Sequence, residues 1–158
     1  MALRNIVTEE DEILRKHAKE VNEISPKIIT ILDDMLETMR NSNGLGIAAP
    51  QVGILKRMFI VEVDDKIIEL INPKIIESRG SQKGEEGCLS VPGFIGTVER
   101  PEYVKMAGLD RNGNQLIVEG TELMAVALCH EFDHLDGILY IDKATDVHKI
   151  DTEQLEEE

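Results

Sequence analysis

Residues 129–137, with the sequence CHEFDHLDG, constrain the fold more than any other stretch of the chain. They contain the pattern H-E-x-x-H, in which His130 and His134 are four positions apart. On a helix, residues four apart lie on one face about one turn from each other, so both imidazole rings can bind one metal ion. Glu131 lies near the same face, where it can handle a proton from a metal-bound water. The pattern therefore predicts a metal site on a helix.

The residues before this pattern predict that the helix is buried. Residues 121–129 (TELMAVALC) are apolar on every face after Glu122, which is typical of a helix surrounded by other elements. Polar groups placed in an interior cost free energy unless they are hydrogen-bonded or ligated. A helix with two incidental histidines leaves that cost unexplained, which favours the metal site. Gly137 is placed to end the helix.

The third ligand decides the class of the metal site. The spacing of the histidines and the following glycine fits the longer metzincin pattern H-E-x-x-H-x-x-G-x-x-H, except that its last position is Tyr140. A thermolysin-like site takes a glutamate well beyond the second histidine, which here falls near Glu153 and Glu156 in a very polar, acidic end. Cys88 remains as a strong candidate.

Composition indicates one globular domain. The chain has 158 residues, of which 42% are hydrophobic and only 3% aromatic, so its core must be built from Ile, Leu, Val and Met. Its net charge of −14 argues against a direct nucleic-acid partner, because phosphate contacts need clustered basic residues. We expect a single catalytic domain over residues 1–150 and a mobile acidic C-terminal tail over residues 151–158.

The chain shows no sign of secretion or membrane insertion. Its N-terminal residues lack the apolar run of a signal peptide, and no stretch approaches the length of a membrane span. Two cysteines do not make a disulfide framework, which fits a reducing compartment. We therefore expect a cytoplasmic protein without a membrane partner.

The remaining patterns predict an α+β fold. Ser25 followed by proline is a helix start, and the apolar spacing after it predicts an N-terminal amphipathic helix over residues 26–42. Runs rich in β-branched residues predict strands at 57–63, 66–72, 74–78, 103–109 and 115–119. We expect residues 85–92 to form a loop between two antiparallel β-sheets, and both sheets to wrap around the central metal-binding helix.

Residues 44–51 (GLGIAAPQ) match the loose dinucleotide fingerprint G-x-G-x-x-A at Gly44, Gly46 and Ala49. That fingerprint requires a strand before it and a helix after it. Here a predicted helix precedes the glycines, and Pro50 with a strand pattern follows them. We therefore reject nucleotide binding and predict a glycine-rich loop that lets the backbone of a ligand approach closely.

Three segments together resemble the peptide deformylase family: residues 44–51 (GLGIAAPQ), 86–90 (EGCLS) and 130–134 (HEFDH). They occur in the family's order, and the form EGCLS is similar to the bacterial type 1 subgroup. The resemblance covers residues 1 to about 147. It implies an enzyme that hydrolyses the formyl group from the initiator methionine of nascent polypeptides and releases formate. Its substrates would be N-formylmethionyl peptides and nascent chains.

The resemblance also implies a set of metal ligands. Cys88, His130 and His134 would bind one divalent ion and leave a fourth position for water, as a catalytic site requires. The family uses Fe(2+), and Zn(2+), Ni(2+) or Co(2+) can occupy the site, because the ligand types do not select one of them. Glu86 and Arg100 match family positions for a supporting ion pair.

Further roles follow from the same resemblance. Glu131 would take the proton of the water and return it to the leaving amine. The side-chain amide of Gln51 and the backbone N–H of Leu89 would stabilise the oxyanion. The backbone around Gly46 would pair with an extended substrate. The methionine side chain would lie against the metal helix, where the pocket candidates, with core packing as their alternative role, are Leu123, Val126 and Ala127.

Two other functions are compatible with the H-E-x-x-H pattern, a small zinc endopeptidase and a metal-stabilised binding protein without turnover. The sequence does not identify partners beyond the substrate. Some deformylases continue into a longer basic helix that docks on the ribosome. Residues 151–158 of this chain are strongly acidic and poorly suited to ribosomal RNA, which argues against that docking mode and leaves a transient ribosome contact open.

Overall fold

The computed structural model describes residues 2–150, and the tail expected over residues 151–158 lies outside them. The helices of the described chain are α1 (Pro26–Asn41), α2 (Glu122–Leu135) and three short 3-10 helices, η1 (Glu12–Arg15), η2 (Ala49–Val52) and η3 (Tyr140–Asp142). The strands are β1 (Gly46–Ala48), β2 (Met58–Val63), β3 (Lys66–Arg79), β4 (Gln82–Cys88), β5 (Val91–Arg100), β6 (Tyr103–Leu109), β7 (Gln115–Thr121) and β8 (Thr145–Lys149).

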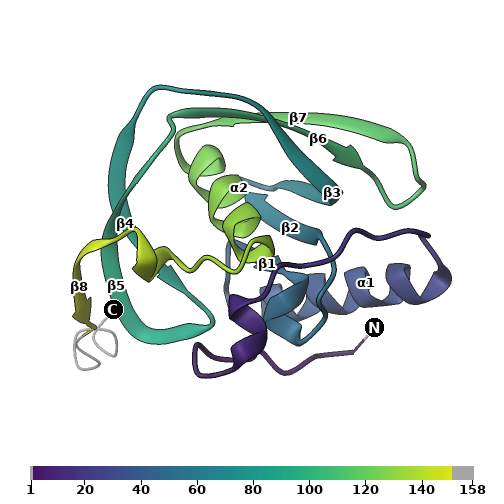
Figure 1. Ribbon diagram of the computed structural model, residues 1–158, viewed down its shortest axis with the longest axis horizontal. Helices are drawn as coiled ribbons and strands as arrows, with labels where there is room; N and C mark the ends of the chain where they lie inside the picture. The colour runs from purple at the N-terminus through teal and green to yellow at the C-terminus, as the bar shows by residue number, and fades with distance from the viewer. Residues whose placement is uncertain (1, 151–158) are drawn as a thin grey trace.

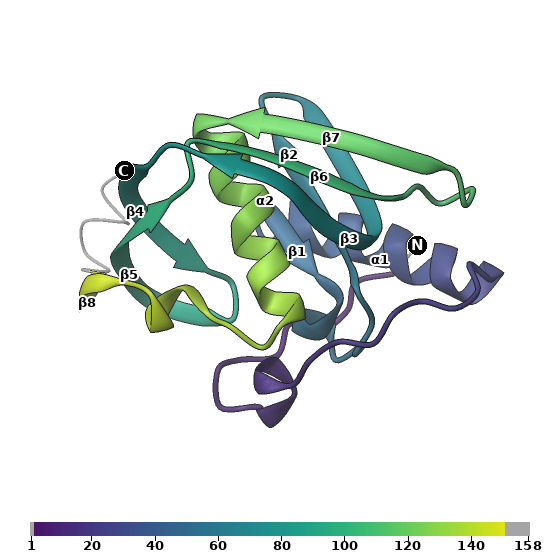
Figure 2. The same ribbon diagram turned by 45° about the horizontal axis from the view of Figure 1, so that its top comes forward.

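These strands form two antiparallel sheets. Five follow the order β1-β2-β3-β6-β7 and three follow the order β4-β5-β8. The strand pairs of both sheets run antiparallel. Figures 1 and 2 show α2 between the two sheets, with α1 beside β1 and β2. The expected α+β class with antiparallel sheets is therefore confirmed.

The larger sheet is covered on both faces around β2. Phe59 and Val61 of β2 belong to the buried cluster that contains the apolar residues of α2. Met58 and Ile60, which alternate with them, belong to the cluster that contains the apolar residues of α1. Because successive side chains of a strand point to opposite faces, the two helices pack on opposite faces of this sheet. Cores on both faces fix the position of β1 and β2, next to the candidate site.

The helix α1 begins and ends close to the predicted boundaries. The side chain of Ser25 accepts a hydrogen bond from the backbone N–H of Ile28, and Pro26 occupies the first turn, where its missing N–H costs nothing. The helix ends at Asn41, one residue earlier than predicted. Its fully buried side chains are Leu32, Met35 and Met39.

The helix α2 carries the H-E-x-x-H residues in its last turns. Gly137 follows the helix with a φ of +76°. A Cβ at this position would lie only 2.5 Å from the backbone oxygen of Arg15, so both the backbone angle and the space require glycine. The prediction that α2 is buried on every side is wrong at Leu123, which is 48% exposed, and at the half-buried Val126. Both residues face the cavity described below.

The structure corrects the predicted loop over residues 85–92. Most of this stretch belongs to β4 and β5, which pair with each other and leave only Leu89 and Ser90 as a turn. Strand preference depends on packing and cross-strand partners, so the stretch EEGCLSVP, which has only one β-branched residue, is not recognised as a strand from its own residues. The predicted strands 66–72 and 74–78 are one strand, β3, with a register shift between Ile71 and Lys74 that accommodates Pro73.

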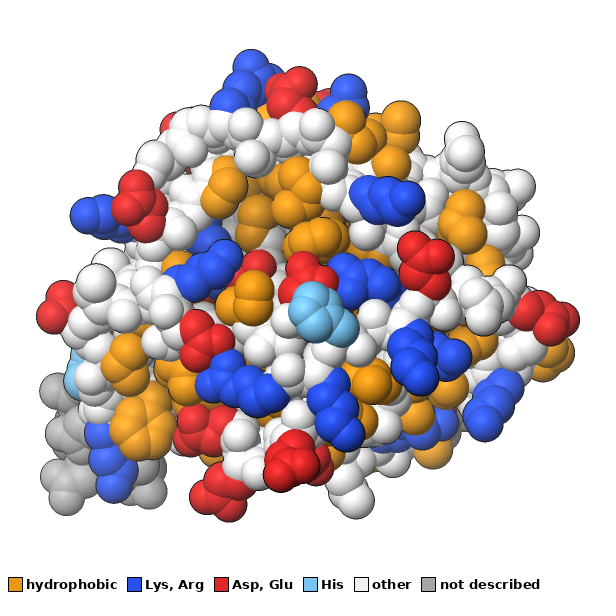
Figure 3. Space-filling model, in the orientation of Figure 1, with side chains coloured by type: hydrophobic (Ala, Val, Ile, Leu, Met, Phe, Trp, Pro, Cys, Tyr) orange, Lys and Arg blue, Asp and Glu red, His pale blue; other side chains and the backbone are white. Residues whose placement is uncertain are grey.

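Charged side chains are mixed over the surface. On the face drawn in Figure 3, Lys and Arg side chains are interspersed with Asp and Glu. Examples of ion pairs are Arg40 with Glu62 at 2.9 Å and Arg57 with Asp136 at 3.0 Å. The net charge of −14 therefore coexists with local ion pairs, each of which contributes little to stability when exposed. Among residues 2–150, no helix is long and apolar enough to cross a membrane.

Candidate metal centre and active-site cavity

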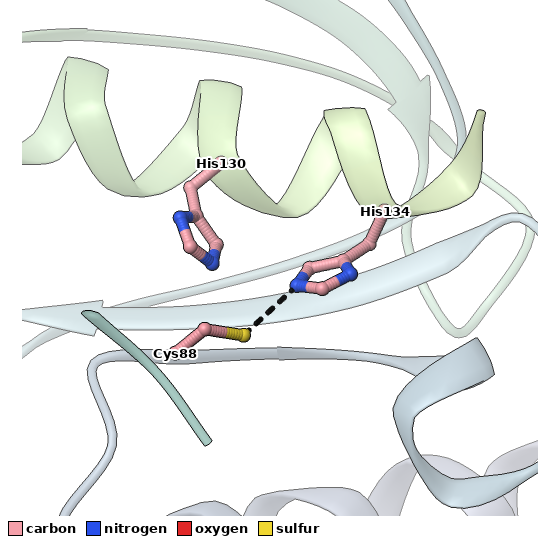
Figure 4. Close-up of side chains that lie close together, drawn as sticks. All are labelled: Cys88, His130 and His134. Atoms are coloured by element: carbon pink, nitrogen blue, oxygen red, sulfur yellow. Dashed lines mark hydrogen bonds between the residues drawn. The ribbon is translucent and has the colours of Figure 1, made fainter. Parts of the chain in front are cut away.

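The structure brings the three predicted metal ligands together. His130 and His134 project from neighbouring turns of α2, and Cys88 comes from the end of β4 (Figure 4). One possible ligand atom from each of these residues lies within 4.8 Å of the other two, and Sγ of Cys88 is 3.3 Å from Nε2 of His134. Donor atoms that surround one tetrahedral ion at its usual bond lengths lie about 3.3–3.8 Å apart. The spacing therefore fits one metal ion.

The chemistry of the three groups also fits a transition metal. A thiol and two imidazoles are soft to borderline donors of the kind that bind zinc and iron. Both imidazoles are buried, with 9% of His130 and 1% of His134 exposed. Nδ1 of His134 is buried and has no hydrogen-bond partner among the described residues, while its Nε2 faces Cys88. Three protein ligands leave an open position, which distinguishes a catalytic from a structural site.

His130 is oriented by a carboxylate. Its Nδ1 lies 2.9 Å from Oε1 of Glu86, and since a carboxylate only accepts, the ring nitrogen donates. Arg100 donates to both oxygens of Glu86 at 2.9 Å. Burial alone raises the pKa of Glu86, but the hydrogen bonds from His130 and Arg100 lower it to about 2. The ionised Glu86 therefore holds the proton of His130 on Nδ1 and leaves Nε2 free to bind a metal.

The same ion-pair network extends along α2 to Asp133 and from there to Lys143. Arg100 also donates to Asp133 at 2.6 Å, and Asp133 lies 3.0 Å from Nζ of Lys143. The ring of Tyr140 stacks near that of His130, with centroids 6.1 Å apart. Sequence reasoning predicted the pair of Glu86 and Arg100 but missed Asp133, although Asp133 lies inside the HEFDH segment. The available signal was an acidic residue three positions after His130, on a helix that the sequence predicts to be buried.

Glu131 lies next to His130 but belongs to a different environment. It is 4% exposed, and its Oε1 is buried without a hydrogen-bond partner among the described residues. Burial raises the pKa of Glu131 to about 7, although the positive charges of His130 and Arg100 act in the opposite direction. A carboxyl group with a pKa near neutrality can both accept and return a proton at physiological pH.

Gln51 is held in a fixed orientation beside Cys88. Its Oε1 accepts a hydrogen bond from the backbone N–H of Ala48 at 2.9 Å. Its Nε2 donates to Oγ of Ser90 at 3.2 Å and lies 3.6 Å from Sγ of Cys88. Leu89 lies between Cys88 and Ser90 in the turn that joins β4 to β5. The side-chain amide and the turn are therefore close to the predicted metal ligands.

A cavity of about 280 Å³ lies beside these residues, near the lower end of the range for small-molecule sites. Its walls come from the segment before and within β1, from β4 and the following turn, and from α2. The predicted site residues that line it are Gly46, Gln51, Cys88, Leu89, Leu123, Val126, Ala127, His130 and Glu131. His134 is the one predicted site residue outside this lining, and it reaches the site through Cys88.

Four further lining residues were not predicted: Asn43, Leu45, Glu85 and Gly87. Each of them is next to a residue that sequence reasoning had selected or lies one position outside a motif. Adjacency to the motifs was therefore the available signal for these residues.

Comparisons with known proteins agree with this geometry. The sequence matches the family model for polypeptide deformylase over residues 3–150. A peptide deformylase of Agathobacter rectalis is 56% identical over 143 residues, which make up 90% of this chain and 90% of the relative. The crystal structure of a peptide deformylase from Legionella pneumophila has a TM-score of 0.88 and 40% identity, and the match covers 92% of this chain and 88% of that chain.

A second solved structure is a peptide deformylase from Synechococcus elongatus in complex with actinonin. It has a TM-score of 0.87 and 37% identity, and the match covers 90% of this chain and 79% of that chain. A match over nearly the whole described chain, with high identity and the same fold, confirms the resemblance inferred from the three segments. The chain belongs to the peptide deformylase family.

Proposed function

We propose that the residues around the cavity carry out the family's reaction, hydrolysis of the formyl group from the initiator methionine of nascent polypeptides with release of formate. Membership of the family supports the reaction. The observation that supports this assignment of residues is the convergence of Cys88, His130 and His134 beside the buried carboxyl group of Glu131. Residues 1–150 act as one catalytic domain in this proposal.

The metal ligands are Cys88, His130 and His134, which makes α2 the central metal-binding helix. Fe(2+) is the ion proposed for the cell, and Zn(2+), Ni(2+) or Co(2+) can occupy the same three donors in purified protein. When bound, the ion supplies Lewis-acid chemistry, which lowers the pKa of water and polarises a carbonyl group. The protein's own contribution is to hold the ligands, with Glu86 and Arg100 fixing the ring of His130.

Glu131 moves the proton in this proposal. It accepts a proton from the attacking water and returns it to the nitrogen of the leaving amine. Its raised pKa, about 7, suits both steps because the group is neither a strong acid nor permanently ionised at that pH. Glu131 lines the cavity and is only 4% exposed, so little bulk water can reach its carboxyl group.

Gln51 and Leu89 stabilise the negative charge that develops on the formyl oxygen. The bond from Ala48 to Oε1 of Gln51 fixes the amide so that Nε2 is directed toward the site. The second donor is the backbone N–H of Leu89, in the turn after Cys88. Each such donor contributes about 3 kcal/mol to catalysis in enzymes of this kind.

The substrate lies along β1 with its methionine side chain against α2. The strand β1 is at the edge of its sheet, so the backbone of Gly46 can pair with an extended peptide. The methionine pocket consists of Leu123, Val126 and Ala127, which line the cavity on the α2 side. Exposed apolar residues at the start of a buried helix are explained by such a pocket, whereas core packing alone would have covered Leu123.

The test compares two reactions on one sample. Purified protein with one equivalent of divalent metal is incubated with formyl-Met-Ala-Ser, and formate and free methionyl peptide are measured; a longer peptide with blocked ends reports cleavage of internal bonds. We expect formate release and no internal cleavage. Internal cleavage would indicate an endopeptidase, and no turnover in metal-loaded protein would indicate a binding protein. Elemental analysis after purification without oxygen identifies the native metal.

A further inference from the structure

We infer that Gly46 is a positioning residue for Glu131, because the missing side chain at position 46 provides the space that the glutamate occupies. The inference rests on the proton-transfer role proposed for Glu131 and adds a reason for a glycine at this position. It is separate from any pairing between the Gly46 backbone and a substrate.

The contact between the two residues is close and involves the middle of the glutamate side chain. A Cβ added to Gly46 would lie 2.5 Å from Oε2, 2.9 Å from Cδ and 2.9 Å from Cγ of Glu131. Real Cβ atoms essentially never approach another heavy atom within 3.0 Å. Rotating the carboxylate about its last bond moves the oxygens but leaves Cγ in place. An alanine at position 46 therefore requires Glu131 to adopt a different rotamer or one of the two backbones to shift.

The backbone of β1 is held on both sides of Gly46. Leu45 accepts a hydrogen bond from the N–H of Glu62 at 2.8 Å, and the N–H of Ala48 donates to Gln51 at 2.9 Å. Gly46 itself pairs with Val61 of β2. Because β2 is buried between two cores, β1 cannot retreat from α2 without losing these bonds.

The backbone of α2 is also fixed. Leu128 and Leu135 are fully buried on the same helix as Glu131, and the N–H of Ala18 donates to the carbonyl of Leu135 at 2.8 Å. With both backbones held, the remaining response to a methyl group at position 46 is displacement of the Glu131 side chain. A misplacement of about 1 Å in a reacting group can lower a rate by about 100-fold.

Other glycines of the site region offer controls. A Cβ at Gly84 of β4 would meet no heavy atom within 4 Å, and its φ lies outside the left-handed region, so Gly84→Ala adds a methyl group into open space. At Gly44, the nearest atom to a Cβ is the end of the Leu89 side chain at 2.8 Å, which can rotate away. The clash with a proposed reacting group is therefore a property of Gly46 in this comparison.

A stability cycle tests the contact without relying on catalysis. Thermal unfolding is measured for the wild type, Gly46→Ala, Glu131→Ala and the double variant, each with metal content determined. We expect Gly46→Ala to lower the Tm when Glu131 is present and to have little effect in the Glu131→Ala background, since the clash is gone. Equal effects in both backgrounds would overturn the inference. If Gly46→Ala does not fold, folding of the double variant supports the inference, and failure of both variants to fold overturns the inference.

Kinetics of a formylated tripeptide supply the functional half of the test. We expect kcat of Gly46→Ala to fall about 100-fold with one metal retained and KM within about threefold, while Gly84→Ala stays near the wild type. A loss confined to KM would assign Gly46 to substrate pairing alone, and near-wild-type turnover would also overturn the inference. If Glu131→Gln proves fully active, the proposed proton transfer fails, yet the stability cycle still decides whether Gly46 seats the glutamate.

Discussion

The two histidines of α2 are one turn apart, yet their surroundings differ. Nδ1 of His130 is hydrogen-bonded to Glu86, which Arg100 holds from both oxygens. No described residue hydrogen-bonds Nδ1 of His134, whose ring is positioned by packing and by its contact with Cys88. The surroundings of His130 are a closed polar network. His134 and Glu131 instead have buried polar atoms without partners among the described residues. The fold thus satisfies the groups that support His130 and leaves Oε1 of Glu131, the proposed proton carrier, without a partner among the described residues.

This difference has an energetic basis. A buried polar atom without a partner costs about 1–3 kcal/mol, so each one needs an explanation, and at Glu131 the proposed proton transfer provides it. The network of Glu86, Arg100 and Asp133 carries charges that would each be costly if left alone in the interior. Substitutions of Cys88, Glu131 or His134 should therefore affect metal binding and catalysis directly. Substitutions in the closed network should act indirectly, through His130, which that network supports.

The largest effect is expected from Cys88→Ser, which replaces the proposed thiolate ligand. A hydroxyl is a much poorer metal donor than a thiolate, so this variant should lose most of its bound metal and nearly all turnover. The decrease in metal affinity should exceed the roughly 10–100-fold typical of changes outside the ligand set. The measurement is metal content by elemental analysis together with a competition titration against a chelator.

Cys129→Ser is the matched control for this experiment. Cys129 is buried in α2, and burial raises the pKa of its thiol to about 11, which keeps it protonated and unsuited to bind a metal. The control should retain one metal equivalent. A full equivalent bound by Cys88→Ser at wild-type affinity would exclude Cys88 as the third ligand.

The next largest effect is expected from Glu131→Gln, which should separate catalysis from metal binding. Glutamine keeps the shape of glutamate and its capacity for hydrogen bonds but cannot accept a proton at neutral pH. Turnover should fall by about 100-fold or more, within the range of general acid–base catalysis. Formate release and metal content are measured on the same sample. Loss of metal would make Glu131 a structural residue or a ligand, and normal turnover with metal retained would assign the proton to another group.

A smaller effect is expected from Glu86→Gln in the closed network. The amide cannot hold the proton of His130 as a carboxylate does, so metal affinity should fall by about 10–100-fold, with a parallel loss of turnover at limiting metal. Turnover at saturating metal should recover much of the loss, which Glu131→Gln cannot do. An unchanged affinity in the chelator competition would show that the histidine is positioned by packing alone.

The same variant should also change the acid stability of the protein. The folded pKa of Glu86, about 2, is below its unfolded value of about 4.3, so its ionisation stabilises the fold above that unfolded value and less and less as the pH falls toward 2. Wild type should be the more stable protein at pH 7, and the gap to Glu86→Gln should narrow between about pH 5 and pH 2. Urea unfolding at several pH values measures this, and a constant gap would contradict it.

The parts of this structure that sequence predicts best depend on short-range rules. The spacing of His130 and His134 is a helical spacing, and the cap at Ser25 is read from two adjacent residues. The pairing of β4 with β5 depends instead on partners far along the chain, so residues 85–92 look like a loop when read alone. The same holds for β8, which pairs with β5 and was not predicted.

The site follows the same rule. The proposed ligand pair on α2 is evident from its spacing. The approach of Cys88 is produced by the turn between two strands of another sheet, so the sequence offered Cys88 only by elimination, and family resemblance then assigned it. Lys143 joins the network through Asp133, a contact between segments that share no motif. The space that Gly46 leaves for Glu131 depends on how close β1 and α2 lie, which no local pattern records.

The smallest effect is expected outside both surroundings of α2, from removal of residues 151–158. This segment offers one apolar side chain, Leu155, among five acids, so its composition provides little surface to bury against a domain. Truncation after Ile150 should leave turnover of a formylated tripeptide within about twofold, which corresponds to about 0.4 kcal/mol in the activation barrier. Steady-state kinetics of the truncated and full chains with equal metal content provide the measurement. A loss of about tenfold or more would mean that the acidic segment shapes the cavity. Residues outside both the network around His130 and the proposed reacting groups would then contribute to catalysis.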